Sequence, residues 1–367
     1  MKNTPLLRLA APIAALWAGL ALPVRAWDYD GHRMVNQLAL SSLPADFPAF
    51  VREPANAERI AFLAGEPDRW RNVGSDLPLV QYNGMDHYLD LEELADAGLD
   101  ATTVPSLRYE FALQFAAGRA AHLDHFPVID PAKNTDHSRE WPGFAPWAIT
   151  EYYGKLKSAF SYLKAFQDLG TPEEIANAQA NILYVMGVMG HYVGDCAQPL
   201  HATKHHHGWV GDNPNGYSTW YGIHAWIDGG LIAKAGITSG AIAPKVVPAQ
   251  PVSLANRLDG RDPMFVAVMD YIIGTQKLVE PLYQLEKAGK LGNDKVTATP
   301  DGKTTSESRP LTVEGRAFIE TQLLRGGEML GAIWVTAWRS AAPDTYLRSQ
   351  LLKRQIPVPA KAGPYDG

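Results

Sequence analysis

Apolar residues along most of this chain recur at intervals of three and four, which is the spacing of one face of an α-helix. The pattern therefore predicts an all-α, mainly helical protein. Helices are expected over residues 31–43, 56–64, about 105–122, 146–167, about 25 residues from 172, 263–287 and 311–340. The polar segment 290–310 is expected to be a loop or an edge hairpin.

One helix start is clearly marked. Residues 171–174 read Thr-Pro-Glu-Glu, which combines an N-cap threonine, proline at the first helical position and glutamate three residues after the cap. This helix should deliver His191 and Asp195 near its C-terminal end, before Pro199 stops it. Close approach by a neighbouring helix is permitted by Gly187, Gly190 and Gly194.

The segments before this helix are less regular. Residues 65–71 are rich in turn-forming and charged side chains and are expected to form a charged loop. Residues 85–90 are expected to be a short extended piece, which would turn His87 to one face and Tyr88 and Asp90 to the other. The polar decapeptide that follows is expected to lie on the surface.

The first 26 residues have the features of a secretory signal peptide. Lys2 and Arg8 flank the start of an apolar run that is too short to span a membrane, and the residues up to Ala26 have the small-x-small form of a cleavage site. We expect cleavage after Ala26 and export to the periplasm or the medium. One domain, 27–342, and a Pro-rich tail, 343–367, would remain.

Charge and cysteine content narrow the range of functions. The chain has 33 lysines and arginines against 39 acidic residues; loss of the signal peptide leaves 30 against 39, a formal charge of −9. Stable binding of duplex nucleic acid is thereby disfavoured, because it needs clustered basic residues. The single cysteine, Cys196, excludes an intramolecular disulfide and is interpreted as a small buried residue. We expect a monomer without a transmembrane segment.

Candidate chemistry is concentrated in residues 191–228. His191 and Asp195 are four residues apart, as are His224 and Asp228, so each pair shares one face of a helix; His201 lies between the pairs. Both pairs lie in apolar runs, where an unpaired histidine and aspartate would be costly to bury. Nitrogen and oxygen donors without thiolate favour a catalytic zinc site. Three further histidines are interpreted as a solvated or substrate-facing loop, not as ligands: His205, His206 and His207.

The predicted new N-terminus offers another donor. A free α-amine on Trp27 would chelate a metal together with its own carbonyl oxygen, with His32 close by. The alternative is that Trp27 is a core aromatic residue and that His32 has a structural role. These residues alone leave both interpretations open.

With these residues in view, the chain resembles the zinc-dependent phosphoesterase superfamily that contains the fungal and plant single-strand nucleases of the S-one/P-one type and bacterial zinc phospholipase C. The resemblance is carried by an ordered set that runs through most of the first two-thirds of the chain: Trp27, His32, Asp68, His87, His191, Asp195, His201, His224 and Asp228. It implies the helical fold of that superfamily and three zinc ions.

The resemblance also implies how the donors are shared. One zinc would be held by Asp68, His87, His191 and Asp195; a second by the amine and carbonyl of Trp27, by His32 and by Asp195; and a third by His201, His224 and Asp228. Zinc lowers the pKa of bound water to about 7, so hydroxide would be available near neutral pH to attack phosphorus. Asp68 would orient it or accept its proton. The resemblance further gives Arg71 a contact with phosphate, Tyr88 a stacked base, and Asp90 a hydrogen bond to that base.

Two features depart from the nuclease pattern. Fungal and plant members carry disulfides, which a single cysteine forbids, and their Gly-Gly-Asn segment is replaced here by residues 208–216, GWVGDNPNG. The gap between His201 and His224 nevertheless matches the longer nuclease spacing. We therefore predict an exported trinuclear-zinc phosphodiesterase that hydrolyses single-stranded RNA and DNA to 5′-phosphate products, with 3′-nucleotides as an optional further substrate. The alternatives are a phospholipase C acting on phospholipid head groups and a non-catalytic zinc-binding exported protein.

Overall fold

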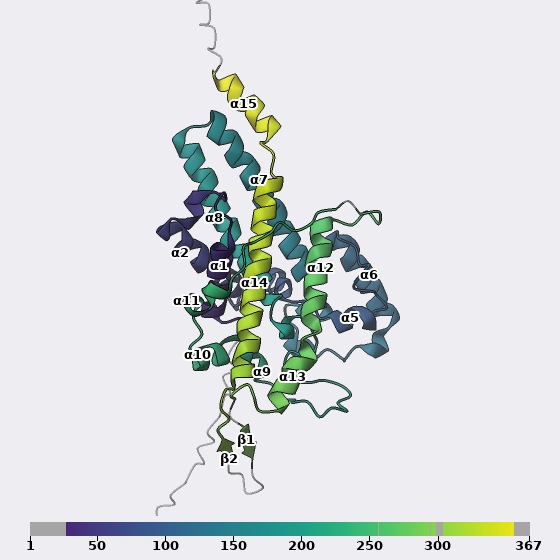
Figure 1. The fold of residues 1–367 in the computed structure, drawn as a ribbon. Coiled ribbons are helices and arrows are strands. Elements are labelled where there is room, and N and C mark those ends of the chain that lie inside the picture. Colours follow the sequence, from purple (N-terminus) through teal and green to yellow (C-terminus); the bar gives the residue numbers. More distant parts are fainter. Residues whose placement is uncertain (1–26, 256, 294, 299–303, 356–367) are drawn as a thin grey trace, which may run out of the picture.

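The computed structural model describes residues 27–255, 257–293, 295–298 and 304–355. The predicted signal peptide, 1–26, and the end of the predicted tail, 356–367, lie outside these residues. The described chain is mainly helical, as the sequence predicts (Figure 1). No helix in the described part is both long and apolar enough to cross a bilayer.

The helical elements in the described part of the chain are of three types: α-helices, short 3₁₀ turns and one π-helix. The α-helices are α1 (Tyr29–Ser42), α2 (Pro54–Leu63), α3 (Glu66–Arg71), α4 (Leu77–Gly84), α5 (Leu91–Asp96), α6 (Arg108–Ala121), α7 (Ala145–Leu169), α8 (Pro172–Asp195), α9 (Ile223–Ala225), α10 (Leu231–Ala235), α11 (Ser239–Ile242), α12 (Pro263–Gln276), α13 (Val279–Lys287), α14 (Val313–Ser340) and α15 (Thr345–Gln355). Short 3₁₀ turns are η1 (Ala49–Arg52), η2 (Met85–His87), η3 (Leu123–His125), η4 (Pro131–Lys133), η5 (Ser138–Glu140), η6 (Pro199–His201) and η8 (Ala243–Lys245), and η7 (Trp226–Gly230) is a π-helix.

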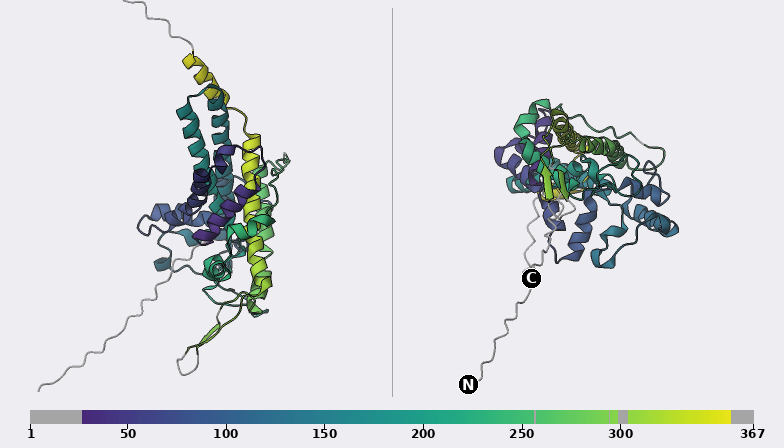
Figure 2. Two further views of the ribbon diagram at one scale, coloured as in Figure 1. Left: turned by 60° about the vertical axis from the view of Figure 1, so that its left-hand side comes forward. Right: turned by 90° about the horizontal axis from the view of Figure 1, so that it is seen from below.

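Four helices make the framework of the core. The long helix α14 runs through the molecule and packs against α1, α7 and α8, while α7 and α8 form a helical hairpin (Figure 1). Figure 2 shows this hairpin projecting at one end of the molecule and the strands at the other. The buried apolar side chains form one contiguous cluster that reaches from Trp27 to Ala341, as expected for a single domain.

Helix α8 begins as the sequence predicts. The Thr171 hydroxyl accepts a hydrogen bond from Glu174 N at 3.3 Å, and the Glu174 carboxylate accepts one from Thr171 N at 3.0 Å. Near the other end, Gly190 lies against Asn36 of α1, and a Cβ there would overlap the Asn36 side chain. The Asn36 amide donates to the carbonyl oxygens of Ile60 and Gly187 at 2.7 and 3.0 Å. The glycine therefore lets α1, α2 and α8 meet at one buried amide.

Some local predictions were wrong. Residues 66–71 form helix α3 rather than a charged loop, and residues 85–87 form a 3₁₀ turn rather than an extended piece; only Tyr88 after it is extended. The polar decapeptide after Asp90 contains α5, whose leucines are buried. The predicted helix 263–287 is two helices, because the Pro281 ring would clash with the carbonyl four residues earlier in a continuous helix.

The last elements extend the framework. Strands β1 (Lys295–Ala298) and β2 (Thr304–Glu307) pair antiparallel, which confirms the hairpin that was one of two options for this segment. In the region interpreted as a Pro-rich tail, residues 345–355 form α15, which packs on α7. Arg354 of α15 pairs with Glu174 at 3.0 Å.

Candidate metal centre

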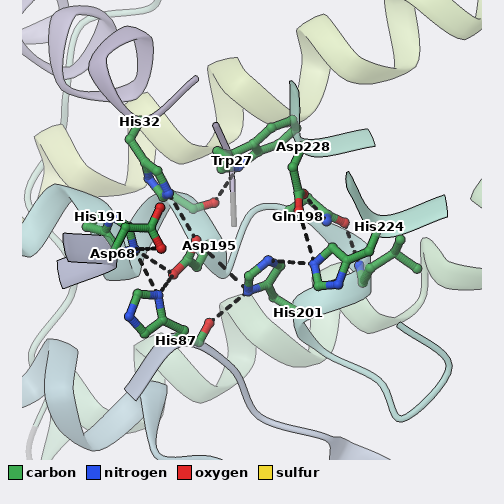
Figure 3. Close-up of polar contacts among 12 residues, drawn as sticks. Trp27, His32, Asp68, His87, His191, Asp195, Gln198, His201, His224 and Asp228 are labelled. Atoms are coloured by element: carbon green, nitrogen blue, oxygen red, sulfur yellow. Dashed lines mark hydrogen bonds and ion pairs between the residues drawn. The ribbon is translucent and has the colours of Figure 1, made fainter. Parts of the chain in front are cut away.

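The predicted ligands meet in the interior. We call the first group the Asp195 cluster, and it consists of His32, Asp68, His87, His191 and Asp195; the second, the Asp228 cluster, consists of His201, His224 and Asp228 (Figure 3). All these side chains are buried. Their donor atoms form three groups that could each hold one ion, two within the Asp195 cluster and one in the Asp228 cluster.

Asp195 is the centre of its cluster. Its Oδ2 lies 3.0 Å from His87 Nδ1 and 3.3 Å from His191 Nε2, while its Oδ1 lies 3.4 Å from His32 Nε2. Asp68 Oδ1 is 3.9 Å from His191 Nε2. Each oxygen of Asp195 therefore faces a different imidazole set, as a carboxylate that bridges two ions does.

The Asp228 cluster is compact and adjoins the first. His224 Nε2 lies 2.9 Å from His201 Nε2 and 3.2 Å from Asp228 Oδ2. His201 Nδ1 donates to the carbonyl oxygen of His87 at 2.9 Å. The same short segment around residue 87 thus supplies a side chain to one cluster and a backbone acceptor to the other.

Backbone carbonyls fix the orientation of two imidazoles. His191 Nδ1 donates to the Ala64 carbonyl oxygen at 2.6 Å, and His201 Nδ1 donates to that of His87. A carbonyl can only accept, so Nδ1 carries the hydrogen, and in the neutral form of each ring Nε2 presents a lone pair to its cluster. This is the arrangement that metal-binding histidines use.

Burial keeps most of these rings neutral. It lowers the pKa of His32, His201 and His224, and together with Arg71 it lowers the pKa of His87 to about 3. Neutral imidazole is the form that binds a metal.

The pKa values of Asp195 and Asp228 are shifted in opposite directions. Burial would raise the pKa of Asp195, but the imidazoles of His191, His201 and His32 outweigh it and hold that pKa well below its usual range. Burial raises the pKa of Asp228 well above its usual range. A bound cation would favour the ionised form of Asp228.

The unpartnered atoms show that the residues fit a metal. Among the described residues, several buried donors and acceptors have no hydrogen-bond partner: His32 Nδ1 and Nε2, His87 Nε2, Asp195 Oδ1, His224 Nδ1 and Asp228 Oδ2. Leaving such atoms unsatisfied is costly, and a cation would satisfy those that face a cluster. Donors around tetrahedral zinc are about 3.3 Å apart, close to the separations found here. The donor types and spacing both fit zinc.

Trp27 lies at the junction of the two clusters (Figure 3). Its ring is fully buried, and the indole Nε1 donates to the carbonyl oxygen of Gly194 at 2.7 Å. The next residue, Asp28, donates its backbone N–H to the carbonyl oxygen of Asp228 at 3.0 Å and accepts from His32 N at 3.2 Å. The side chain is therefore a core aromatic residue, and its backbone is held beside the metal-capable groups.

Helix α3 brings the predicted catalytic pair together. Arg71 Nε donates to Asp68 Oδ1 at 2.7 Å, and both side chains are largely buried. Burial opposes ionisation of Asp68, but Arg71 and nearby imidazoles lower its pKa to about 2. The guanidinium thus adds a positive charge beside the Asp195 cluster.

The predicted substrate residues follow His87. Tyr88 is half-buried, and its ring lies against Gly143. Asp90 is buried; its backbone N–H donates to the Pro142 carbonyl oxygen at 2.7 Å, while its Oδ1 has no hydrogen-bond partner among the described residues. Burial raises the pKa of Asp90 well above its usual range. Its Oδ1 lies 3.9 Å from His206 Nδ1, and a buried carboxyl oxygen without a hydrogen bond can bind a polar group of a substrate.

The loop after His201 is more structured than predicted. His205 is buried and stacks on Trp209 with ring centroids 3.9 Å apart, so a solvated loop is wrong for this residue. The His207 ring stacks on that of Tyr221, with centroids 4.2 Å apart, and its centroid lies 5.4 Å from that of the His224 ring. Tyr221 and Trp220 are 65% and 41% exposed, which puts accessible aromatic rings close to the Asp228 cluster.

Sequence reasoning missed Gln198 and Tyr221. Gln198 is fully buried, and its Nε2 donates to Asp228 Oδ1 at 2.6 Å. No spacing rule connects position 198 to position 228. The aromatic residues before His224 were a visible signal, but only the fold shows that they flank the cluster.

Comparisons with known proteins do not identify a family for this chain. No protein-family model matches the chain, and no curated protein matches it. Among solved structures, the alpha toxin from Clostridium absonum is similar, with a TM-score of 0.38 and 11% sequence identity over 91% of this chain and 68% of that chain. A similarity at this level says nothing about substrate or mechanism.

Proposed function

We propose that this protein is a zinc-dependent phosphodiesterase with three zinc ions. The observation that carries the proposal is the position of Asp195, whose two oxygens face separate imidazole sets, with the Asp228 cluster directly beside them. Zinc at these positions would activate water near neutral pH and offset the negative charge that develops on a phosphate ester. We further propose that Trp27, after cleavage at Ala26, contributes its amine and carbonyl oxygen beside His32.

The protein's own side chains complete the chemistry. Asp68 has a depressed pKa, so its ionised carboxylate can orient the attacking water. Arg71 is held against Asp68 and can bind a phosphate oxygen. Several buried imidazoles remain neutral and exclude bulk water from the reacting atoms, which strengthens these electrostatic interactions.

The proposed substrate is single-stranded nucleic acid, together with 3′-nucleotides. Tyr88 offers a ring next to His87, and Asp90 offers an unpartnered carboxyl oxygen to a base. Stacking of a base on an aromatic ring contributes roughly 1–3 kcal/mol and tolerates most sequences. The charge of the chain, net −6 for all residues, fits a substrate held by metal and stacking better than one held by a broad basic surface.

A phospholipid head group is the second candidate substrate. Exposed apolar and aromatic side chains lie in the segment between His201 and His224 of the Asp228 cluster: Val210, which is 46% exposed, Trp220 and Tyr221. Aromatic side chains with one apolar and one polar edge are suited to a membrane surface. The same phosphodiester chemistry would then release a phosphorylated head group.

One set of assays separates the candidates. Purified mature protein is analysed for zinc and then incubated with an oligonucleotide, 3′-AMP and phosphatidylcholine vesicles, with and without chelator. Chelator-sensitive cleavage of the first two supports the nuclease, and cleavage of the third supports the phospholipase. Three equivalents of zinc without hydrolysis of any of them would point to a non-catalytic zinc protein. Well under three equivalents, with no hydrolysis, would exclude the proposal altogether.

A further inference from the structure

Gln198 connects the helix that carries Asp195 to two ligands of the Asp228 cluster. Its Oε1 accepts a hydrogen bond from Leu200 N at 2.6 Å and so caps the 3₁₀ turn η6, which ends at His201. Its Nε2 donates to Asp228 Oδ1 at 2.6 Å. Its side chain is fully buried, so water cannot take over either hydrogen bond.

We propose that Gln198 is the positioning residue of the Asp228 cluster, and that its amide determines which oxygen of Asp228 binds the metal. This inference rests on the proposed function, because it requires an ion between His201, His224 and Asp228. Both ends of the Gln198 amide are engaged by protein groups, so we do not assign it as a ligand.

The two oxygens of Asp228 have different environments. Oδ1 is occupied by the Gln198 N–H, whereas Oδ2 has no hydrogen-bond partner among the described residues and lies 3.2 Å from His224 Nε2. The amide therefore holds the carboxylate so that Oδ2 points at the imidazoles. A free carboxylate could rotate and present either oxygen, and part of its binding free energy would be lost in ordering it.

The backbone of Gln198 strengthens the connection. Its N–H donates to the Asp195 carbonyl oxygen at 2.9 Å, and its carbonyl oxygen accepts from His201 N at 3.0 Å. The end of α8 and the turn η6 are thus tied together at this residue. A glutamine is suited to the position because one side-chain end donates while the other accepts.

Two substitutions of Gln198 distinguish loss of the hydrogen bond donated to Asp228 from a change in side-chain shape. Gln198→Glu has the same size and keeps an acceptor for Leu200 N, but an ionised carboxylate cannot donate to Asp228 and repels it. Gln198→Leu removes both hydrogen bonds. The matched control is Gln322 on α14, which is 2% exposed, donates to Phe318 O at 3.1 Å and accepts from Arg325 at 2.8 Å. The control variants are Gln322→Glu and Gln322→Leu.

The measurement is zinc content and affinity, with no assay of activity. Full-length mature variants are loaded with zinc, dialysed against graded concentrations of a chelator, and analysed for bound metal; visible absorption of the cobalt-substituted proteins reports the geometry of each site. We expect both Gln198 variants to bind one ion, that of the Asp228 cluster, about 10- to 100-fold less tightly than wild type. The other two ions should be unaffected, and the Gln322 variants should match wild type.

The outcomes are distinguishable. Wild-type affinity for all three ions in Gln198→Glu would overturn the inference while leaving the proposed function intact. An equal weakening of all three ions in that isosteric variant would also overturn it, because a general defect is not positioning of one carboxylate. Wild-type protein that binds no zinc would overturn the proposed function and this inference together. If Gln198→Leu fails to fold, Gln198→Glu alone decides.

Discussion

Arg71 lies one helical turn after Asp68 on α3, and its Nε donates to Asp68 Oδ1 at 2.7 Å. The guanidinium is therefore held beside the Asp195 cluster by the carboxylate that it also helps to keep ionised. In the proposed reaction it would bind a phosphate oxygen as negative charge develops there.

We expect Arg71→Ala to lower kcat by about 100- to 1000-fold, the usual effect of removing one donor to a developing oxyanion. Zinc content should stay at the wild-type value. Arg69→Ala is the matched control, because Arg69 is on the same helix but its side chain is 64% exposed and pairs with Glu66. Steady-state kinetics and metal analysis of both variants are the measurements; loss of zinc in Arg71→Ala would show that its role is structural.

Asp195 and Asp228 should differ in how many ions depend on them. Since Asp195 faces two sets of imidazoles and Asp228 faces one, Asp195→Asn should lose about two zinc equivalents and Asp228→Asn about one. Metal analysis after dialysis tests this difference. Equal losses in the two variants would be inconsistent with a bridging Asp195.

Tyr88→Ala tests the aromatic platform. Loss of a stacked base should raise KM for a short oligonucleotide by about 5- to 150-fold, which corresponds to roughly 1–3 kcal/mol. Tyr88→Phe keeps the ring and should retain the wild-type KM. Hydrolysis kinetics on the oligonucleotide and on a small phosphodiester without a base are compared; an unchanged KM in Tyr88→Ala would remove Tyr88 from the substrate site.

The histidines after Thr203 should make the metal-free protein sensitive to acid. Burial lowers the pKa of both His206 and His207 to about 4, against 6.5 for a free side chain. The unfolded chain therefore binds protons between about pH 6.5 and 4 that the folded chain does not, so stability falls as pH decreases through this window and is constant with respect to these groups above it.

Urea unfolding in chelator at pH 7, 6 and 5 measures this effect. The double variant His206→Gln/His207→Gln should show a shallower decrease in unfolding free energy than wild type. His125→Gln, at an exposed position, is the control and should behave as wild type. Identical slopes in all three proteins would show that these rings titrate alike in the folded and unfolded chains.

The N-terminus provides a separate test of the ligand proposed at Trp27. Protein that keeps Ala26 has an amide in place of the α-amine and should bind one zinc fewer than protein that begins at Trp27. Trp27→Phe with a correct N-terminus keeps the amine but loses the hydrogen bond to Gly194, so it should keep its zinc and have a lower Tm. Intact mass and zinc content of each form are measured together; equal zinc in the two N-terminal forms would exclude the amine as a ligand.

The sequence predicted the strongly periodic parts of the fold well. The capping box at Thr171 defined the start of α8, and the four-residue intervals placed His191 and Asp195 on its buried end. These signals are local, so they can be recognised without knowledge of the rest of the chain. The gathering of His32, Asp68 and His87 around them depended on resemblance, because the contacts are made between distant segments.

The incorrect and missed predictions also have identifiable physical causes. Pro67 suggested a turn, but proline is also favoured in the first turn of a helix, and α3 forms there. The alternation near His87 was too short to distinguish an extended piece from a 3₁₀ turn. Gln198 escaped notice because its role is defined by Asp228, which lies 30 positions further on.

The hydrogen bond between Trp27 and Gly194 joins positions 167 apart, and the members of the Asp195 cluster are distributed over a similar stretch, from His32 to Asp195. No short fragment of the chain contains all of them, so the ions of this cluster should select the completed native state and slow its unfolding rather than nucleate folding. Shortage of zinc during maturation would then leave a chain that folds but opens more often, and sensitivity to proteases would reveal it.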